Sequence, residues 1–389
     1  MTTSNDASSN VGRPAQGGTT RSSQWRRRLL SRLPTSCHAG RLFIQLPSGE
    51  ELRRTSANDG PSAGVTIHRW RALRRLFLSG HVGFAESYLD GDWDSPDLKA
   101  LFTWAMANQT NLSSIWGGSV VSRLMARLRH HRNANSRRGS RRNIAAHYDL
   151  GNAFYAAWLD GDMNYSSGLY TPDVQTLEAA QEAKLDRIIS LLDLKGGERI
   201  LEIGCGWGAL AERLAGRHGC HVTALTLSRE QQAFAKQRIA RRGLDERVDI
   251  RLEDYRAVSG EFDRIVSIEM IEAVGQRYWP TYFEVLRKRM KPGGIGVLQA
   301  ITIDETIFPT YVDEPDFIQR YIFPGGMLPT RSILREQIAK AGLLLQTEDT
   351  FGASYVSTLE EWQARFTASW PHLRHQGFDE RFRRMWLYY

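Results

Sequence analysis

The chain has 389 residues and a net charge of +8, with 41% hydrophobic and 24% charged residues. This length is enough for two domains of ordinary size, each with a core of its own. An apolar run of about eighteen residues, which a membrane-spanning helix needs, is absent. Three cysteines, Cys37, Cys205 and Cys220, argue against a disulfide framework and have no metal-ligand spacing. We expect a cytoplasmic protein with reduced thiols and no metal.

Residues 1–24 are expected to be disordered, because they are rich in Ser, Thr, Asn and Gly and nearly free of large apolar side chains. They also lack the apolar stretch of a secretory signal. Residues 25–116 indicate a small α+β domain. Its strands are expected at 41–46 and 65–67 and a helix at 71–78, before a turn-rich aromatic stretch at 80–98.

Cations crowd the stretch 117–142, which is predicted to link this domain to the next. The stretch has no acid, and its cations are Arg123, Arg127, Arg129, His130, His131, Arg132, Arg137, Arg138, Arg141 and Arg142. A smaller cluster, residues 26–28, lies beside Trp25. Such clusters attract nucleic acid or the anionic face of a membrane, whereas a solvated linker is the plainer interpretation. Composition alone does not choose between the two anionic partners.

The remaining residues, 143–389, alternate strands and helices as a doubly wound sheet does. An aromatic helix is expected at 143–158 and another helix at 176–192. Strands are expected at 199–203, 221–227, 248–252, 263–268 and 295–300, with a sixth before residue 351. The predicted fold class is therefore α/β.

The segment ERILEIGCGWGAL, residues 198–210, indicates a strand, a glycine turn and a helix. Such a turn places helix N–H groups beside a ligand, and Glu202 adds a carboxylate. Its spacing is G-x-G-x-G, whereas nicotinamide-binding turns have G-x-G-x-x-G and an acid after the second strand. It therefore resembles the S-adenosylmethionine (SAM) loop of class I methyltransferases, where the acid meets the cationic amino-acid part of SAM. A dehydrogenase turn and a turn without ligand are the alternatives.

Ligands of doubly wound sheets bind beyond the carboxyl ends of the strands. Polar residues at these strand ends, which are therefore candidates for the site, are Glu202, Thr226, Ser228, Asp254, Tyr255, Glu269, Glu272 and Gln299. Gln231, one helical turn after Ser228, can face the same crevice.

Together the motifs resemble those of the cyclopropane-fatty-acyl-phospholipid synthase family, near its branch that makes mid-chain methyl or methylene fatty acids. The matching segments are GHVGFAESYLDGDWDSPDL (80–98), HYD (147–149), YSS (165–167), EMIEAVG (269–275), QAITI (299–303), RYIFPGGMLP (320–329) and FGASYVSTLEEW (351–362). The resemblance extends from about residue 41 to the last residue. It implies a Rossmann-like methyltransferase sheet preceded by a small lipid-associated domain.

The resemblance also implies a set of SAM-binding residues. These are Tyr165, Ser166, Glu202, Gly204, Cys205, Gly206, Trp207, Gly208, Thr226, Leu227, Ser228, Gln231, Asp254, Tyr255 and Arg256. Hydroxyl and amide groups can bind a ribose, and aromatic faces suit a sulfonium cation. A tyrosine taken alone is more often a buried ring with a satisfied hydroxyl.

Methyl transfer to a lipid double bond generates a carbocation, so the enzyme must exclude water and then remove a proton. The product is a cyclopropane or a chain with a methyl or methylene branch. Aromatic side chains that could line an acyl-chain tunnel, although each alone fits an ordinary core, are Tyr278, Trp279, Tyr321, Phe323 and Tyr355.

In this family the base is a bound bicarbonate, held by a Glu, a His, a Tyr and backbone near a Cys. Glu272 and Tyr355 match the Glu and the Tyr, and Ile301 matches a backbone position near the anion. Gln299 replaces the His and Ser167 the Cys, so bicarbonate and ring closure are both in question. Ala273 also replaces a His that commonly follows the Glu. The sequence leaves open whether Glu272, a bound anion or water accepts the proton.

We expect a SAM-dependent methyltransferase that acts on an unsaturated phospholipid in peripheral contact with an anionic membrane. A nucleic-acid methyltransferase is the rival interpretation, although EMIE after the fourth strand is unlike a target-base motif. An inactive lipid-binding relative is the third. The sequence stops within an expected aromatic helix at 383–389, before the seventh strand that these folds normally add. We therefore expect an open sheet edge and reduced stability, or completion of the sheet by a partner. The sequence does not decide whether the protein forms a homodimer.

Overall fold

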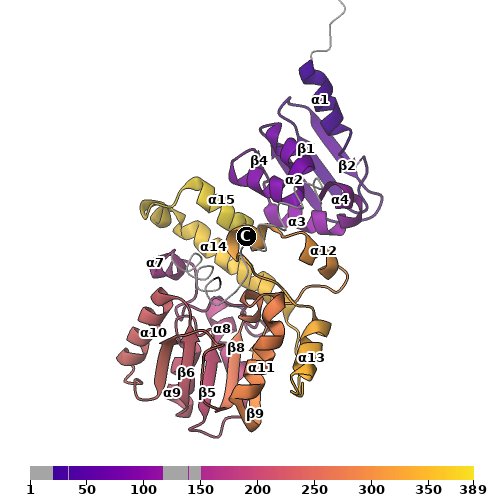
Figure 1. Ribbon diagram of the computed structural model, residues 1–389. Helices are drawn as coiled ribbons and strands as arrows, with labels where there is room; N and C mark the ends of the chain where they lie inside the picture. Colours follow the sequence, from indigo (N-terminus) through magenta and orange to yellow (C-terminus); the bar gives the residue numbers. More distant parts are fainter. Residues whose placement is uncertain (1–20, 34, 117–138, 140–149) are drawn as a thin grey trace, which may run out of the picture. The chain divides into compact units, whose positions relative to one another are not determined.

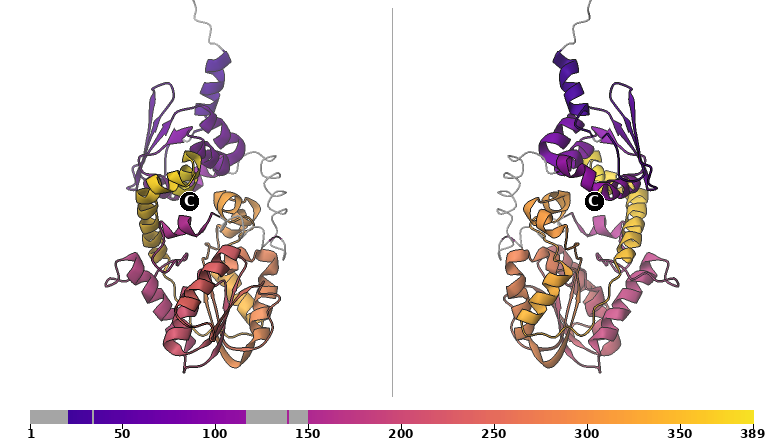
Figure 2. Two further views of the ribbon diagram at one scale, coloured as in Figure 1. Left: turned by 90° about the vertical axis from the view of Figure 1, so that its left-hand side faces the viewer. Right: turned by 90° about the vertical axis from the view of Figure 1, so that its right-hand side faces the viewer.

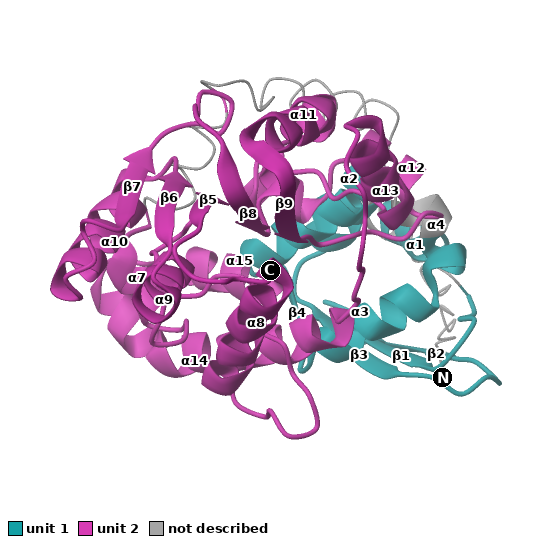
Figure 3. Ribbon diagram, turned by 90° about the horizontal axis from the view of Figure 1, so that it is seen from below, with its two compact units in different colours: residues 1–116 teal, residues 117–389 magenta. Residues whose placement is uncertain are grey.

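The computed structural model describes residues 21–33, 35–116, 139 and 150–389. The chain divides into two compact units, Met1–Trp116 and Gly117–Tyr389 (Figure 3). Nearly all of the predicted basic linker 117–142 lies outside the described residues, as do residues 147–149. Within the described ranges, no helix has the length and apolar character that crossing a membrane requires.

Unit 1 combines a four-stranded sheet with helices, as Figure 1 shows in outline. Its strands are β1 Arg41–Gln45, β2 Glu51–Thr55, β3 Ser62–Ile67 and β4 Trp93–Asp94, in the order β2-β1-β3-β4. Its helices are α1 Arg21–Leu30, α2 Arg71–Leu89, α3 Leu98–Ala107 and α4 Gln109–Trp116. Strand β1 alternates buried Leu42 and Ile44 with exposed neighbours, so one face of the sheet packs on the core.

Two expectations for unit 1 are wrong. The stretch 80–98 is not mainly turns, because α2 continues to Leu89 across a kink at Gly80, where φ is 61°. Glycine tolerates this φ, and Val82 and Tyr88 beyond it are buried, so core packing sustains the second half of the helix. Helix α1 begins at Arg21, so the last four residues of the segment 1–24 that was expected to be disordered are helical, whereas residues 1–20 lie outside the described residues.

Unit 2 contains the predicted doubly wound α/β sheet. Its parallel strands are β5 Arg199–Ile203, β6 His221–Thr226, β7 Val248–Leu252, β8 Phe262–Ile268 and β9 Met290–Gln299, in the order β7-β6-β5-β8-β9. The order reverses beside β5, so the ends of β5 and β8 flank the switch point where ligands of such sheets bind. Strand β9 begins at Met290, five residues before the expected start, and the expected strand before residue 351 is not formed.

Helices and short turns connect these strands. They are α7 Asn152–Ala156, α8 Leu177–Leu192, α9 Ala209–His218, α10 Arg229–Arg241, η1 Ile271–Ala273, η2 Gln276–Tyr278, α11 Trp279–Arg289, α12 Phe308–Asp313, η3 Ile318–Ile322, α13 Arg331–Lys340, α14 Gly352–His375 and α15 Glu380–Tyr388. The predicted helices at 176–192 and 383–389 are thus confirmed as α8, with Thr176 as its N-cap, and as the end of α15.

Helices cover both faces of the sheet (Figures 1 and 2). Ile200 packs in one core cluster, which α8, α9 and α10 share, whereas its neighbour Leu201 packs in a second cluster with α11 and α13. Successive residues of a strand point to opposite faces, so a continuous apolar strand fits this double burial. The apolar run ends at the carboxyl end of β5, where the glycine turn begins.

An aromatic cluster joins α7 to α14 and α15. Phe154 on α7 is fully buried, and its ring centroid lies 4.9 Å from that of Trp386 and 6.4 Å from that of Phe366. Rings at such spacings add edge-to-face contacts to the burial of apolar area. This cluster fixes the segment that follows α7, which carries Tyr165, Ser166 and Ser167.

Candidate active site

The glycine turn between β5 and α9 leaves room beside its backbone at Gly206. Gly204, Gly206 and Gly208 have φ values of 85°, 52° and 86°, a region that favours residues without a Cβ. The N–H of Gly204 donates to the Leu225 carbonyl at 3.0 Å, which ties the turn to β6. A Cβ added to Gly206 would meet no atom within 4 Å. A ligand can therefore approach the backbone beside the N-terminus of α9.

A buried carboxylate lies at the end of the same strand. Glu202 is 4% exposed, and its Oε2 has no hydrogen-bond partner among the residues described. Burial raises the pKa of Glu202 to about 8, because a carboxylate that loses water without gaining a donor is destabilised. A cationic ligand group would satisfy this oxygen. The geometry thus fits the cationic amino-acid part of SAM.

Cys205 and Trp207 are buried inside the turn, so they support it rather than line open space. Trp207 Nε1 donates to Asn152 Oδ1 at 2.7 Å, which links the turn to α7. Tyr165 lies nearby in the fold, because its ring and that of Trp207 both pack against the ring of Tyr155. The ring centroids of Tyr165 and Trp207 lie 5.5 and 5.1 Å, respectively, from that of Tyr155. These contacts bring the predicted SAM residues from two distant segments to one place.

Three residues predicted to bind SAM form one hydrogen-bonded group after β6. Thr226 Oγ1 donates to Gln231 Oε1 at 2.8 Å, and Ser228 Oγ accepts the N–H of Gln231 at 3.2 Å as the N-cap of α10. All three are buried, and Leu227 between them is half-buried. The group holds the start of α10 in place at the strand ends.

The turn after β7 holds an ion pair and an aromatic ring. Arg256 Nη2 lies 2.6 Å from Asp254 Oδ2, and the guanidinium lies 5.3 Å from the centroids of Tyr255 and Tyr278. The hydroxyl of Tyr255 is buried and has no hydrogen-bond partner within the described ranges. Burial raises the pKa of Tyr255 to about 12, so the hydroxyl stays neutral and can bind a ligand.

A second centre forms around Glu269, the residue that follows β8. Glu269 Oε1 accepts hydrogen bonds from the N–H of Ser167 and from Gln299 Nε2, each at 2.8 Å. Glu269 Oε2 accepts a hydrogen bond from the Tyr355 hydroxyl at 3.2 Å. The three donors come from the segment after α7, the end of β9 and α14. Burial raises the pKa of Glu269, while these donors and Lys184 oppose the rise.

Lys184 of α8 supplies a buried cation near this centre. It is 3% exposed and donates to Ser166 Oγ at 2.8 Å. Burial lowers its pKa to about 8, whereas the negative charges of Glu269 and Asp160 raise it. Lys184 therefore offsets part of the negative charge and orients Ser166.

Glu272 lies in the 3-10 turn η1 after β8. Its Oε1 accepts the N–H of Ile301 at 2.5 Å, and its Oε2 is buried without a hydrogen-bond partner among the described residues. Burial and the nearby charge of Glu269 raise the pKa of Glu272 to about 8. At neutral pH a carboxyl group with this pKa is mostly protonated.

The five residues predicted for the base step thus fall into two groups. Ser167, Gln299 and Tyr355 surround Glu269, whereas Ile301 binds Glu272. Sequence reasoning placed Glu269 at a strand end but gave it no role, and it missed Lys184. The available signal was a second acid, three residues before Glu272, directly after β8.

A turn of this kind on a doubly wound sheet, with a buried acid at the end of its first strand, defines a class I SAM-dependent methyltransferase. Crystal structures agree: a mycolic acid cyclopropane synthase complexed with SAH and CTAB has a TM-score of 0.60 and 28% identity, covering 64% of this chain and 90% of that one. The cyclopropane synthase MmaA2 from Mycobacterium tuberculosis has a TM-score of 0.58 and 29% identity, with the same coverage.

The model of the mycolic acid cyclopropane synthetase family matches residues 135–389. The tuberculostearic acid methyltransferase of Mycobacterium tuberculosis is 41% identical over 86% of this chain and 80% of its own length. The cyclopropane-fatty-acyl-phospholipid synthase of Escherichia coli is 37% identical over 85% of this chain and 84% of its own. The chain belongs to this family and is a SAM-dependent methyltransferase of the cyclopropane-fatty-acyl-phospholipid synthase type.

Proposed function

We propose that this enzyme transfers a methyl group from SAM to the cis double bond of an unsaturated phospholipid acyl chain. The product is a cyclopropane or a methyl- or methylene-branched chain. The names of the relatives, which include a cyclopropane-fatty-acyl-phospholipid synthase, support a lipid acceptor. The assignment of individual site residues is part of the proposal.

The observation that carries the proposal is the concentration of carboxyl groups at the site. Glu202, Glu269 and Glu272 all lie at the ends of β5 and β8, and Lys184 is the buried cation among them. An ionised carboxylate in a buried site stabilises a positive charge that develops on a hydrocarbon chain. Three carboxyl groups and one lysine suit a phosphate backbone poorly, which argues against the nucleic-acid alternative.

The chain's own residues have distinct tasks in this reaction. When bound, SAM supplies an activated methyl group on a cationic sulfur. The glycine turn, Glu202 and Tyr255 would hold it. Water must be kept from the cation, since hydration would give an alcohol instead, and the apolar side chains of Phe317, Ile322 and Met327 are buried in the segment that follows β9.

The test uses purified protein, SAM and vesicles of either monounsaturated or fully saturated phospholipid. We expect methylated lipid, and one S-adenosylhomocysteine per methyl group, with the unsaturated vesicles alone. Duplex and single-stranded nucleic acid at the same salt concentration serve as competing acceptors. Methylation of nucleic acid, with unchanged lipid, would contradict the proposal.

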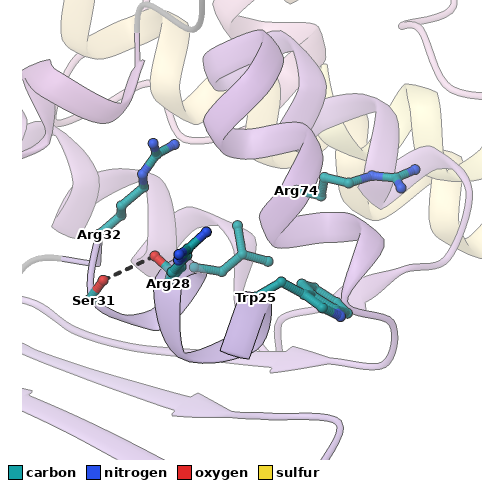
Figure 4. Close-up of a pocket in the computed structure, with 6 residues that line it drawn as sticks. Trp25, Arg28, Ser31, Arg32 and Arg74 are labelled. Carbon is teal, nitrogen blue, oxygen red and sulfur yellow. Dashed lines mark hydrogen bonds between the residues drawn. The ribbon is translucent and has the colours of Figure 1, made fainter. Parts of the chain in front are cut away.

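We further propose that unit 1 contacts an anionic membrane through α1. A surface pocket there is lined by Trp25, Arg28, Leu29, Ser31, Arg32 and Arg74 (Figure 4). Trp25 is 40% exposed, so an aromatic ring accompanies the three guanidinium groups. Rings of this kind bind at the membrane interface and each arginine near an anionic surface adds about 1 kcal/mol.

Reversing two charges of this pocket, by Arg28→Glu with Arg32→Glu, should weaken binding to anionic vesicles at least about tenfold. Sedimentation with vesicles of defined anionic content measures the effect. Arg53→Glu with Arg54→Glu on β2 is the matched control, since Arg53 is already paired with Glu51. Equal losses in both double variants would show that net charge, rather than this pocket, determines binding.

A further inference from the structure

Glu269 has the features of a preorganised base. Its carboxylate accepts hydrogen bonds from Ser167, Gln299 and Tyr355, which three separate segments supply. Its φ is 47°, and only Met163 and Asp193 share a positive φ among the other described non-glycine residues. Such backbone strain is concentrated at functional sites. The residue directly follows β8, beside the switch point of the sheet where ligands of such folds bind.

We infer that the Glu269 carboxylate itself accepts the proton that the methylated acyl chain releases, in place of a bound bicarbonate. The inference rests on the proposed function, because it concerns the carbocation that methylation of a double bond would leave. It assigns a base that belongs to the chain rather than to the solution.

The donors that a bicarbonate would need are already used. The N–H of Ser167 and the hydroxyl of Tyr355, at positions that the resemblance assigns to the anion, both donate to Glu269. Gln299, at the position of the family's His, does the same. A second anion at this place would lack these donors and would face the charge of Glu269. Bicarbonate therefore does not fit the site.

Glu272 is a poorer candidate on geometric grounds. One oxygen is held by the N–H of Ile301, and the other is buried without a partner among the described residues. Glu269 has three donors that stabilise its charged form, whereas Glu272 has one and lies beside a negative charge. Lys184 and Tyr355 are the other titratable groups near Glu269, and Lys184 favours its ionised form.

The proton transfer is balanced without any co-reactant. Addition of the methyl group to one alkene carbon leaves its neighbour with an empty orbital. A C–H bond then breaks, its electron pair forms the ring bond or a new double bond, and the proton binds to a Glu269 oxygen. After the product leaves, the neutral carboxyl group returns its proton to water.

The experiment compares wild type, Glu269→Gln and Glu269→Gly in buffer depleted of carbon dioxide, with and without added bicarbonate. Wild type should make lipid product at the same rate in both. Glu269→Gln should lose about a hundred- to ten-thousandfold in kcat, while its affinity for SAM stays within about threefold of wild type. Glu336→Gln, on the surface of α13, is the matched control and should retain wild-type activity.

Glu269→Gly provides the second readout. Glycine accepts the positive φ, so the fold should be retained, and its Ser167, Gln299 and Tyr355 donors are released. Bicarbonate should bind to this variant, as seen by calorimetry or by 13C NMR of labelled bicarbonate, and should restore part of its activity. Wild type should show no such binding.

Three results would overturn the inference: a wild-type rate that requires bicarbonate, an active Glu269→Gln, or a folded Glu269→Gly that binds no bicarbonate. A wild type without lipid product would instead contradict the proposed function. The bicarbonate-binding comparison remains valid in that case, because it does not depend on turnover.

Discussion

Glu202→Gln is expected to weaken SAM binding by about a hundredfold, because hydrogen bonds to charged groups and their desolvation are each worth about 1.5–3 kcal/mol. The wild-type carboxylate has a pKa of about 8 before ligand binds, and its Oε2 has no hydrogen-bond partner within the described ranges. A cationic ligand favours the ionised form. SAM binding to wild type should therefore release a proton at neutral pH.

The affinity for SAM should depend on pH because the pKa of Glu202 is raised. Below about pH 8 the free enzyme holds the proton on Glu202, so affinity should rise by up to about tenfold per pH unit and level off above it. Calorimetry in two buffers of different ionisation enthalpy measures the proton release. Glu202→Gln should lose this dependence, whereas Glu230→Gln, an exposed residue in the first turn of α10, should keep it. The same pH profile in wild type and Glu202→Gln would contradict this role.

Phe154→Ala is expected to lower the free energy of unfolding of unit 2 by about 3–5 kcal/mol, as large aromatic deletions in cores do. The ring is fully buried, and its centroid lies 5.1 Å from those of Tyr155 and Phe378 and 5.4 Å from that of Phe382. Removing it leaves a cavity where α7, α14 and α15 meet. Faster hydrogen exchange in α15 should accompany the loss.

Leu344→Ala is the control for this prediction, since Leu344 is 83% exposed and its truncation should change stability by less than about 0.5 kcal/mol. Denaturant unfolding and hydrogen exchange monitored in unit 2 measure both variants. Similar effects of the two substitutions would show that the aromatic cluster does not hold the C-terminal helices.

Local sequence signals predicted much of unit 2. The apolar strand before Gly204 and the glycine turn after it depend on a few neighbouring residues, so this strand, turn and helix can be predicted from local sequence. The prediction of a doubly wound sheet was confirmed because it depended on such local signals. The expected strand before residue 351 did not form. A strand needs a hydrogen-bonded neighbour in a sheet, and among the described residues β9 pairs only with β8.

The role of Glu269 could not be predicted from neighbouring residues in the sequence. Its three donors lie 102, 30 and 86 residues away in the sequence, so only the folded chain brings them together. The apparent mismatch at Gln299 and Ser167 illustrates this. In the sequence they replace ligands of an anion, whereas in the structure the Gln299 side chain and the Ser167 N–H bind a carboxylate that the chain itself supplies.

The most direct test of the account is mass spectrometry of total fatty acids from cells that express this chain and are rich in monounsaturated phospholipid. The cells are fed methionine with a trideuterated methyl group. We predict acyl chains that gain one labelled carbon. Two retained deuteriums would mean that the proton was lost from the transferred methyl group. Three retained deuteriums would mean that the proton was lost from the acyl chain. Unlabelled fatty acids, from cells in which the folded protein binds SAM, would contradict the claim that an acyl chain is the methyl acceptor.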